Sequence, residues 1–135
     1  MPHVSRIKLS KNTEEELLKN LNLALSSIND SSEMISFLNS LLTPTERIMI
    51  AKRLATIILI EENLSDSDIA DTLHLTRITV AKMRLFYEAR GQGFKIALKK
   101  LKEHKRFEEF KEVLLSLAHD IAKASGGRVR HLIPD

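Results

Sequence analysis

Apolar side chains recur every three or four residues along most of this chain, a spacing that is typical of amphipathic α-helices. The polar run at residues 29–32 separates the first two stripes. They consist of Leu17, Leu21, Ala24, Leu25 and Ile28, and then of Met34, Phe37, Leu38, Leu41 and Leu42. The pattern predicts an all-α protein. Its first helix is expected to begin at a Thr13–Glu16 capping box, and both helices need an apolar partner surface.

A third helix is predicted from Pro44 to about Glu62. Thr43 is a suitable N-cap, Pro44 is favoured at the first helical position, and Glu46 completes a capping box. Apolar residues occupy most of the circumference of this helix. We therefore expect it to be central and buried on several sides, by helices of the same chain or of a second subunit.

Two short helices joined by a tight turn are predicted over residues 65–86. Ser65 with Asp68, and Thr76 before the second helix, are N-terminal capping signals. The turn falls at His74, where a positive φ is required and glycine is more usual. The apolar anchors and the small crossing residue are Ile69, Ala70, Leu73, Leu75, Val80 and Met83. This spacing is that of a helix-turn-helix, although two helices that merely pack together remain an alternative.

The outer face of the second helix carries polar and basic side chains without a carboxylate. In a major groove, side chains at these positions would meet base edges. They are Arg77, Ile78, Thr79, Ala81 and Lys82. The sequence therefore indicates a DNA-contacting helix.

Gly91 and Gly93 are expected to end this helix, and a last amphipathic helix follows over residues 106–123. The Gly-x-Gly here lacks a preceding strand and a third glycine, so it does not indicate a phosphate-binding loop. The predicted organisation is a mobile arm over residues 1–12, a single helical domain over 13–124 and a flexible tail over 125–135.

The 135 residues include no cysteine, which excludes disulfides and thiolate chemistry and favours a cytoplasmic protein. No signal peptide or membrane-spanning run is evident. The net charge of +3 is unevenly distributed: residues 9–75 hold 5 Lys and Arg against 11 Asp and Glu, whereas residues 76–111 hold 11 against 4. A basic half that begins with the predicted DNA-contacting helix indicates a polyanionic partner. For residues 99–111 alone, a solvated lysine-rich face is the alternative.

Catalysis is not indicated. The five histidines are scattered without metal-ligand spacing, and the aspartates at 66, 68 and 71 lie in the first turns of a helix, where carboxylates favour the helix dipole. We expect neither an enzyme nor a metal site, and no required cofactor.

Three segments together resemble the bacterial Trp repressor superfamily. They are Phe37-Leu-Asn-Ser-Leu-Leu-Thr-Pro-Thr-Glu-Arg47, Ala51-Lys-Arg53, and Leu64-Ser65 at the start of the helix-turn-helix. The Gly-x-Gly-Phe-Lys pattern within residues 84–98 looks closer to the Trp-repressor-like regulators of unassigned ligand. The resemblance implies an intertwined homodimer, with N-terminal helices of one subunit wrapped around the other and two helix-turn-helix heads in successive major grooves. With the cap at Thr76 included, the candidate DNA-binding residues are Ser65, Thr76, Arg77, Ile78, Thr79, Ala81 and Lys82.

The resemblance also implies a ligand site, for which Thr43, Arg53 and Lys82 are the candidates. In tryptophan-binding members the indole lies between two arginines, with a glycine next to the second. Arg53 matches the first, but Lys82 and Met83 occupy the positions of the second arginine and the glycine. Lysine lacks a planar guanidinium that stacks on a ring, which argues against tryptophan as a co-repressor and leaves another small molecule open.

The sequence thus favours a sequence-specific DNA-binding transcription regulator, a repressor that acts as a homodimer on a palindromic operator. The alternatives are a helical protein-interaction module and a nonspecific DNA-binding protein.

Overall fold

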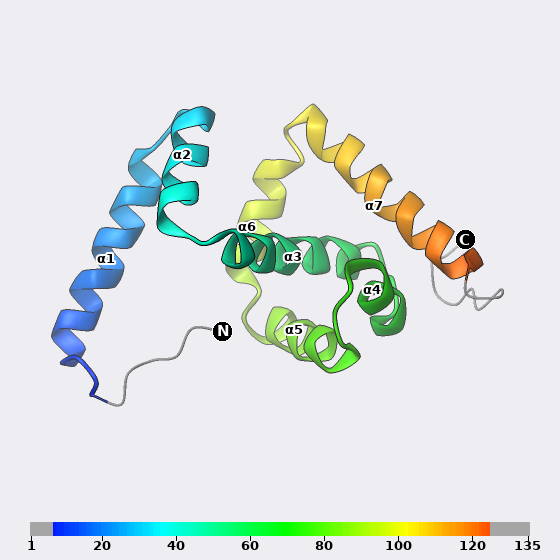
Figure 1. Cartoon of the computed structure of the whole chain (residues 1–135), viewed down its shortest axis with the longest axis horizontal. Coiled ribbons are helices and arrows are strands. Elements are labelled where there is room, and N and C mark those ends of the chain that lie inside the picture. Colours follow the sequence, from blue (N-terminus) through cyan, green and yellow to red (C-terminus); the bar gives the residue numbers. More distant parts are fainter. Residues whose placement is uncertain (1–6, 125–135) are drawn as a thin grey trace. The chain divides into compact units, whose positions relative to one another are not determined.

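The computed structural model describes residues 7–124, and in this part of the chain it forms seven α-helices and no strand (Figure 1). The all-α prediction is confirmed. Most of the predicted arm and the whole predicted tail, residues 1–6 and 125–135, lie outside the described residues. Contacts within the chain divide it into two compact units, residues 1–47 and 48–135, so a single domain over residues 13–124 stays a prediction.

The first unit contains α1 (Lys11–Ser27) and α2 (Ser31–Leu41). Helix α1 starts before the predicted capping box, because the Ser10 hydroxyl accepts the Thr13 backbone N–H at 3.2 Å and makes Ser10 the N-cap. The prediction of Thr13 as the cap was therefore wrong. Asp30 caps α2 by accepting the Glu33 backbone N–H at 3.0 Å. Neither helix contains a buried residue.

Helix α3 (Pro44–Glu61) begins at the predicted capping box. The Thr43 hydroxyl accepts the Glu46 backbone N–H at 3.1 Å, and the Thr43 N–H donates to Glu46 Oε1 at 2.8 Å. This N–H, and then the Thr43 hydroxyl, lower the pKa of Glu46. In the single chain the predicted burial is present in the second half of the helix, where residues 55–60 are buried. Ile48 and Ile50 are more than half exposed, and burial of this first half by a second subunit stays a prediction.

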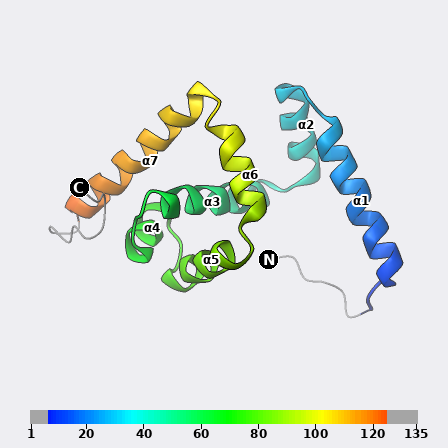
Figure 2. The same cartoon turned by 180° about the vertical axis from the view of Figure 1, so that it is seen from behind.

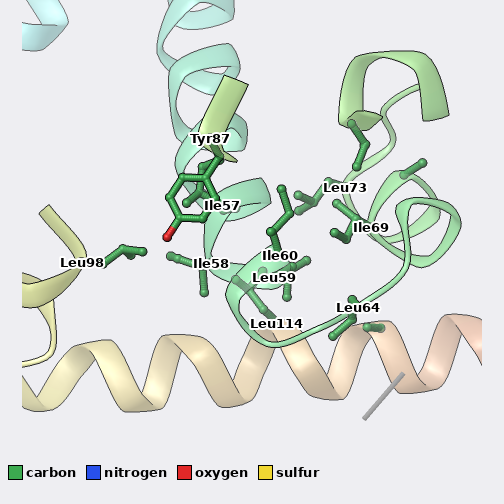
Figure 3. Close-up of a cluster of buried hydrophobic side chains, with 14 of the residues drawn as sticks. Ile57, Ile58, Leu59, Ile60, Leu64, Ile69, Leu73, Tyr87, Leu98 and Leu114 are labelled. Atoms are coloured by element: carbon green, nitrogen blue, oxygen red, sulfur yellow. The ribbon is translucent and has the colours of Figure 1, made fainter. Parts of the chain in front are cut away.

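The second unit is built from the rest of α3 with α4 (Asp66–Leu73), α5 (Arg77–Arg90), α6 (Gln92–Leu101) and α7 (Lys105–Ala124). Its core gathers on the buried half of α3, where Figure 3 shows side chains converging from the surrounding helices. Helix α7 packs against α4, and the view from behind shows the two helices near each other (Figure 2). Helix α7 contributes Phe107, Leu114 and Ala118 to the core. This packing fixes the position of α4 within the unit.

The junction between α5 and α6 rests on one glycine rather than two. Gly91 ends α5 and precedes α6, whereas Gly93 is already the second residue of α6, so the prediction that it ends a helix was wrong. Tyr87 is buried beside this junction, with its ring edge-on to Phe94 at a centroid distance of 6.2 Å. The Tyr87 hydroxyl hydrogen-bonds to the Glu61 carboxylate on α3. A buried aromatic residue therefore links α3, α5 and α6.

Candidate nucleic-acid interface

Helices α4 and α5 form the predicted helix-turn-helix, and both predicted caps are present. The Ser65 hydroxyl accepts the Asp68 backbone N–H at 3.1 Å, and the Thr76 hydroxyl accepts the Thr79 backbone N–H at 3.1 Å. Each bond satisfies an N–H that the first turn of a helix leaves unpaired. Local hydrogen bonds therefore define where each helix starts.

The turn between the helices depends on His74. This residue is left-handed, with φ 55° and ψ 52°, and is one of two non-glycine residues with positive φ in the described chain. The backbone N–H groups of His74 and Leu75 both donate to the Ala70 carbonyl oxygen, the latter at 2.9 Å. Two hydrogen bonds thus hold a conformation that a non-glycine residue adopts at a cost.

The predicted anchors lie in the core. Ile69 and Val80 are fully buried, and Ala70 and Leu73 are also buried. Leu75 and Met83 are partly buried against them. Tight packing between the two helices therefore sets how α5 is presented to solvent.

Arg84 is a site residue that the sequence analysis missed. Its Nε donates to Asp66 Oδ1 at 2.7 Å and its Nη2 donates to the Leu64 carbonyl oxygen at 2.9 Å. The guanidinium therefore joins α5 to the start of α4. A basic residue two turns into the second helix, with an aspartate in the first turn of the first, is the sequence signal for this link.

The N-terminal turns of α5 present the predicted DNA-binding side chains to solvent. Arg77, Ile78, Thr79 and Lys82 are exposed and Ala81 is half-buried. The first carboxylate on α5 is Glu88, near the far end of the helix. The exposed start of α5 is therefore free of negative side chains that would repel phosphate.

The two cap hydroxyls are partly committed to the protein itself. Ser65 Oγ donates to Asp68 Oδ2 at 2.9 Å, and Thr76 Oγ1 hydrogen-bonds to Thr79 Oγ1 at 2.9 Å. Ser65 is half-buried, whereas Thr76 and Thr79 are exposed. Contacts of these hydroxyls with DNA stay predictions.

Basic side chains continue beyond the helix-turn-helix onto α6. Lys95, Lys99 and Lys100 lie on α6 and Lys102 is its C-cap, and all four are exposed. Leu98 points from the same helix into the core, as Figure 3 shows. The lysine face is thus on the solvent side of an amphipathic helix.

The predicted ligand residues are not brought together by the described contacts. Thr43 uses its N–H and hydroxyl in the cap of α3, and it belongs to a different compact unit from Arg53 and Lys82. Arg53 and Lys82 are exposed on α3 and α5. The ligand site stays a prediction.

A shallow hollow lies on the outer side of α7. Its lining consists of Glu109, Glu112, Val113, Ser116, Leu117 and Asp120. Within residues 7–124 no group of three or more His, Asp or Glu side chains is placed to hold a metal ion. In the same range, no helix is sufficiently long and apolar to cross a membrane.

Comparison with known proteins identifies the family to which this chain belongs. The model of the family described as Trp repressor protein matches residues 16–102, which is more than half of the chain. The chain therefore belongs to the Trp repressor family, a family of DNA-binding transcription regulators rather than enzymes. The match runs from α1 through α6, and α7 lies beyond it. No curated protein and no solved structure matches the chain significantly.

Proposed function

We propose that this protein is a homodimeric transcription repressor that binds a palindromic operator through the N-terminal turns of α5. The observation that carries the proposal is the exposed start of α5, where Arg77, Ile78 and Lys82 face solvent and no carboxylate of this helix precedes Glu88. Val80, which is fully buried, and Arg84, which bonds to Asp66 and to the Leu64 carbonyl oxygen, hold the helix in place.

Phosphate contacts from lysine and arginine would supply most of the affinity and its dependence on salt. Side chains on the first turns of α5 would supply the preference for sequence by contacting base edges. Occupation of a promoter by such a complex would block transcription.

The N-terminal helices support the proposed dimer. They contain no buried residue, yet several of their large apolar side chains are about half exposed or more in the single chain. These are Leu17, Leu18, Leu23, Ile35 and Leu41. A second copy that covers these side chains would remove them from water. Two-fold symmetry then places the half-sites about 34 Å apart or a multiple of that distance.

A small-molecule co-repressor is proposed as a regulator of the dimer, with Thr43, Arg53 and Lys82 as its candidate contacts. Tryptophan is not favoured, since Lys82 lacks the flat guanidinium surface on which an indole ring stacks. The first binding experiment should therefore be run without ligand and repeated with free amino acids.

Nonspecific DNA binding is the second candidate, and the lysine face of α6 favours it. Ammonium groups on an exposed helix contact phosphate without regard to sequence. A steep salt dependence without a preferred site would identify this function. A helical module that docks on an acidic protein would instead show no binding to any duplex at low salt.

Selection of bound duplexes from a random library, at near-physiological salt, tests the proposal directly. We expect an enriched palindrome. The Arg77→Ala variant serves as the matched control, because it removes an exposed side chain from the proposed interface and leaves the buried anchors intact. Absence of enrichment with and without added amino acids would contradict the proposed function.

Light scattering tests the dimer separately. We expect a dimer at micromolar concentration and a shift to monomer in Leu17→Glu, which places a charge in the apolar stripe of α1. Val113→Glu on α7 is the control, because Val113 is 63 % exposed and Leu17 is 56 % exposed. A monomeric wild-type protein would contradict the dimer.

A further inference from the structure

Ile78 is an apolar side chain that lies on the surface and takes no part in the packed core. It is 68 % exposed, the highest value for a large apolar side chain within the described residues 48–124. Single exposed apolar residues are common on protein surfaces. We therefore base the inference on the position of Ile78 on α5 and not on its exposure alone.

Ile78 is the second residue of α5, directly after Arg77 and two residues after the cap at Thr76. In a helix-turn-helix the N-terminal residues of the second helix contact base edges in the major groove. Ile78 is thus presented where bases are contacted, not where a helix meets the protein core.

The side chains in the first turn of α5 differ in whether they are already hydrogen-bonded within the protein. The Thr76 hydroxyl accepts the Thr79 N–H and is hydrogen-bonded to the Thr79 hydroxyl, so these two side chains are engaged with each other. Arg77 and Ile78 remain as the exposed side chains without a cap bond in this turn. Arg77 is suited to guanine, whereas Ile78 offers no hydrogen-bonding group.

The major groove presents one apolar group to such a side chain, the C5-methyl of thymine. We propose that Ile78 contacts this methyl group and makes a thymine in each half-site a determinant of specificity. The inference rests on the proposed function, since it requires a selected operator. It goes further by naming the base and the chemical group that the helix recognises.

Leu85 provides the matched control. It lies seven residues further along α5, on the same side of the helix, and is 67 % exposed. A protein partner on this side of α5 would cover Ile78 and Leu85 alike. A major groove that meets the N-terminal turns would cover Ile78 preferentially.

The test replaces each thymine of the selected duplex, one at a time, by deoxyuridine, which removes only the C5-methyl group. Binding is measured for the wild-type protein, Ile78→Ala and Leu85→Ala. At one thymine per half-site we expect the replacement to weaken wild-type binding about fourfold, the effect of one buried methyl-sized group. The replacement should have no effect on Ile78→Ala and the full effect on Leu85→Ala. Circular dichroism checks that both variants remain folded.

Equal deoxyuridine effects in the wild-type protein and Ile78→Ala would overturn the inference, as would a selected site in which no thymine methyl contributes to binding. Either result leaves the proposed function standing, because an operator has been selected. Failure to select any operator would instead contradict the proposed function itself, and the inference with it.

Discussion

Arg84 and Asp66 connect the two helices of the helix-turn-helix across 18 residues of sequence. Arg84 Nε lies 2.7 Å from Asp66 Oδ1, and the same guanidinium donates to the Leu64 carbonyl oxygen. Both side chains are about one third exposed, so water weakens the charge interaction. The hydrogen bond to the Leu64 carbonyl oxygen is directional, so it orients the guanidinium more strictly than the ion pair alone would.

We expect Arg84→Ala to lower the free energy of unfolding by about 1 kcal/mol, because it removes a charged donor from two acceptors at a partly exposed site. Urea denaturation followed by circular dichroism measures this loss. Arg84→Lys keeps the charge but not the fork geometry and should recover only part of it. Asp66→Asn leaves the hydrogen bond to Leu64 in place, so it should lower the free energy of unfolding less than Arg84→Ala does. An Arg84→Ala protein as stable as the wild type would show that the link contributes nothing.

Arg77 lies exposed in the first turn of α5. If it pairs with guanine, Arg77→Ala should weaken operator binding by about 1 to 3 kcal/mol and relax the preference at one position of each half-site. Repeating the duplex selection with the variant measures both effects. Weakening that is uniform across all sequences would assign Arg77 to a phosphate contact instead.

Gly91 and Gly93 should respond in opposite directions to alanine. A Cβ at Gly91 would lie 2.5 Å from Tyr87 Cδ1 and closer still to the Tyr87 carbonyl oxygen, so we expect Gly91→Ala to destabilise the protein by about 1 to 3 kcal/mol. A Cβ at Gly93 meets no heavy atom within 4 Å. Because Gly93 is already helical, Gly93→Ala should stabilise the protein by up to about 1 kcal/mol. Urea denaturation of both variants tests the pair, and equal effects would contradict this account of the junction.

Glu46 links stability to pH through the cap of α3. The Thr43 backbone N–H, followed by its hydroxyl, lowers the pKa of Glu46 in the folded protein. A depressed carboxyl pKa contributes stability above the pKa of the unfolded chain, about 4.3, and that contribution is lost as the pH falls through the lower folded value. The Glu46→Gln variant has no carboxyl group at this position and should lack this pH-dependent contribution to stability.

The measurement is the difference in unfolding free energy between the wild-type protein and Glu46→Gln as a function of pH. We expect the difference to shrink on acidification below the ordinary glutamate pKa. A difference that stays constant from about pH 3 to pH 7 would show that the cap does not favour the ionised form.

Local sequence was sufficient where the interacting groups are three or four residues apart. The caps at Thr43, Ser65 and Thr76 were all predicted, because each side chain bonds a backbone N–H of the same turn. The anchors of the helix-turn-helix were predicted from their spacing along the sequence, which sets the side of each helix on which they lie. At α1 the local argument failed, since Ser10 and Thr13 both carry a hydroxyl suited to a cap and only the structure distinguishes them.

The sequence by itself determined the helical class, the helix-turn-helix and the side chains that α5 presents, because these depend on periodicity and on short-range hydrogen bonds. The tertiary structure decided which half of α3 is buried, the link from Arg84 to Asp66 and the packing of α7 along α4. These features join residues far apart in the chain. Many different apolar surfaces can cover the same stripe of apolar side chains on a helix. The spacing of the stripe therefore predicts which face is buried but not which element covers it.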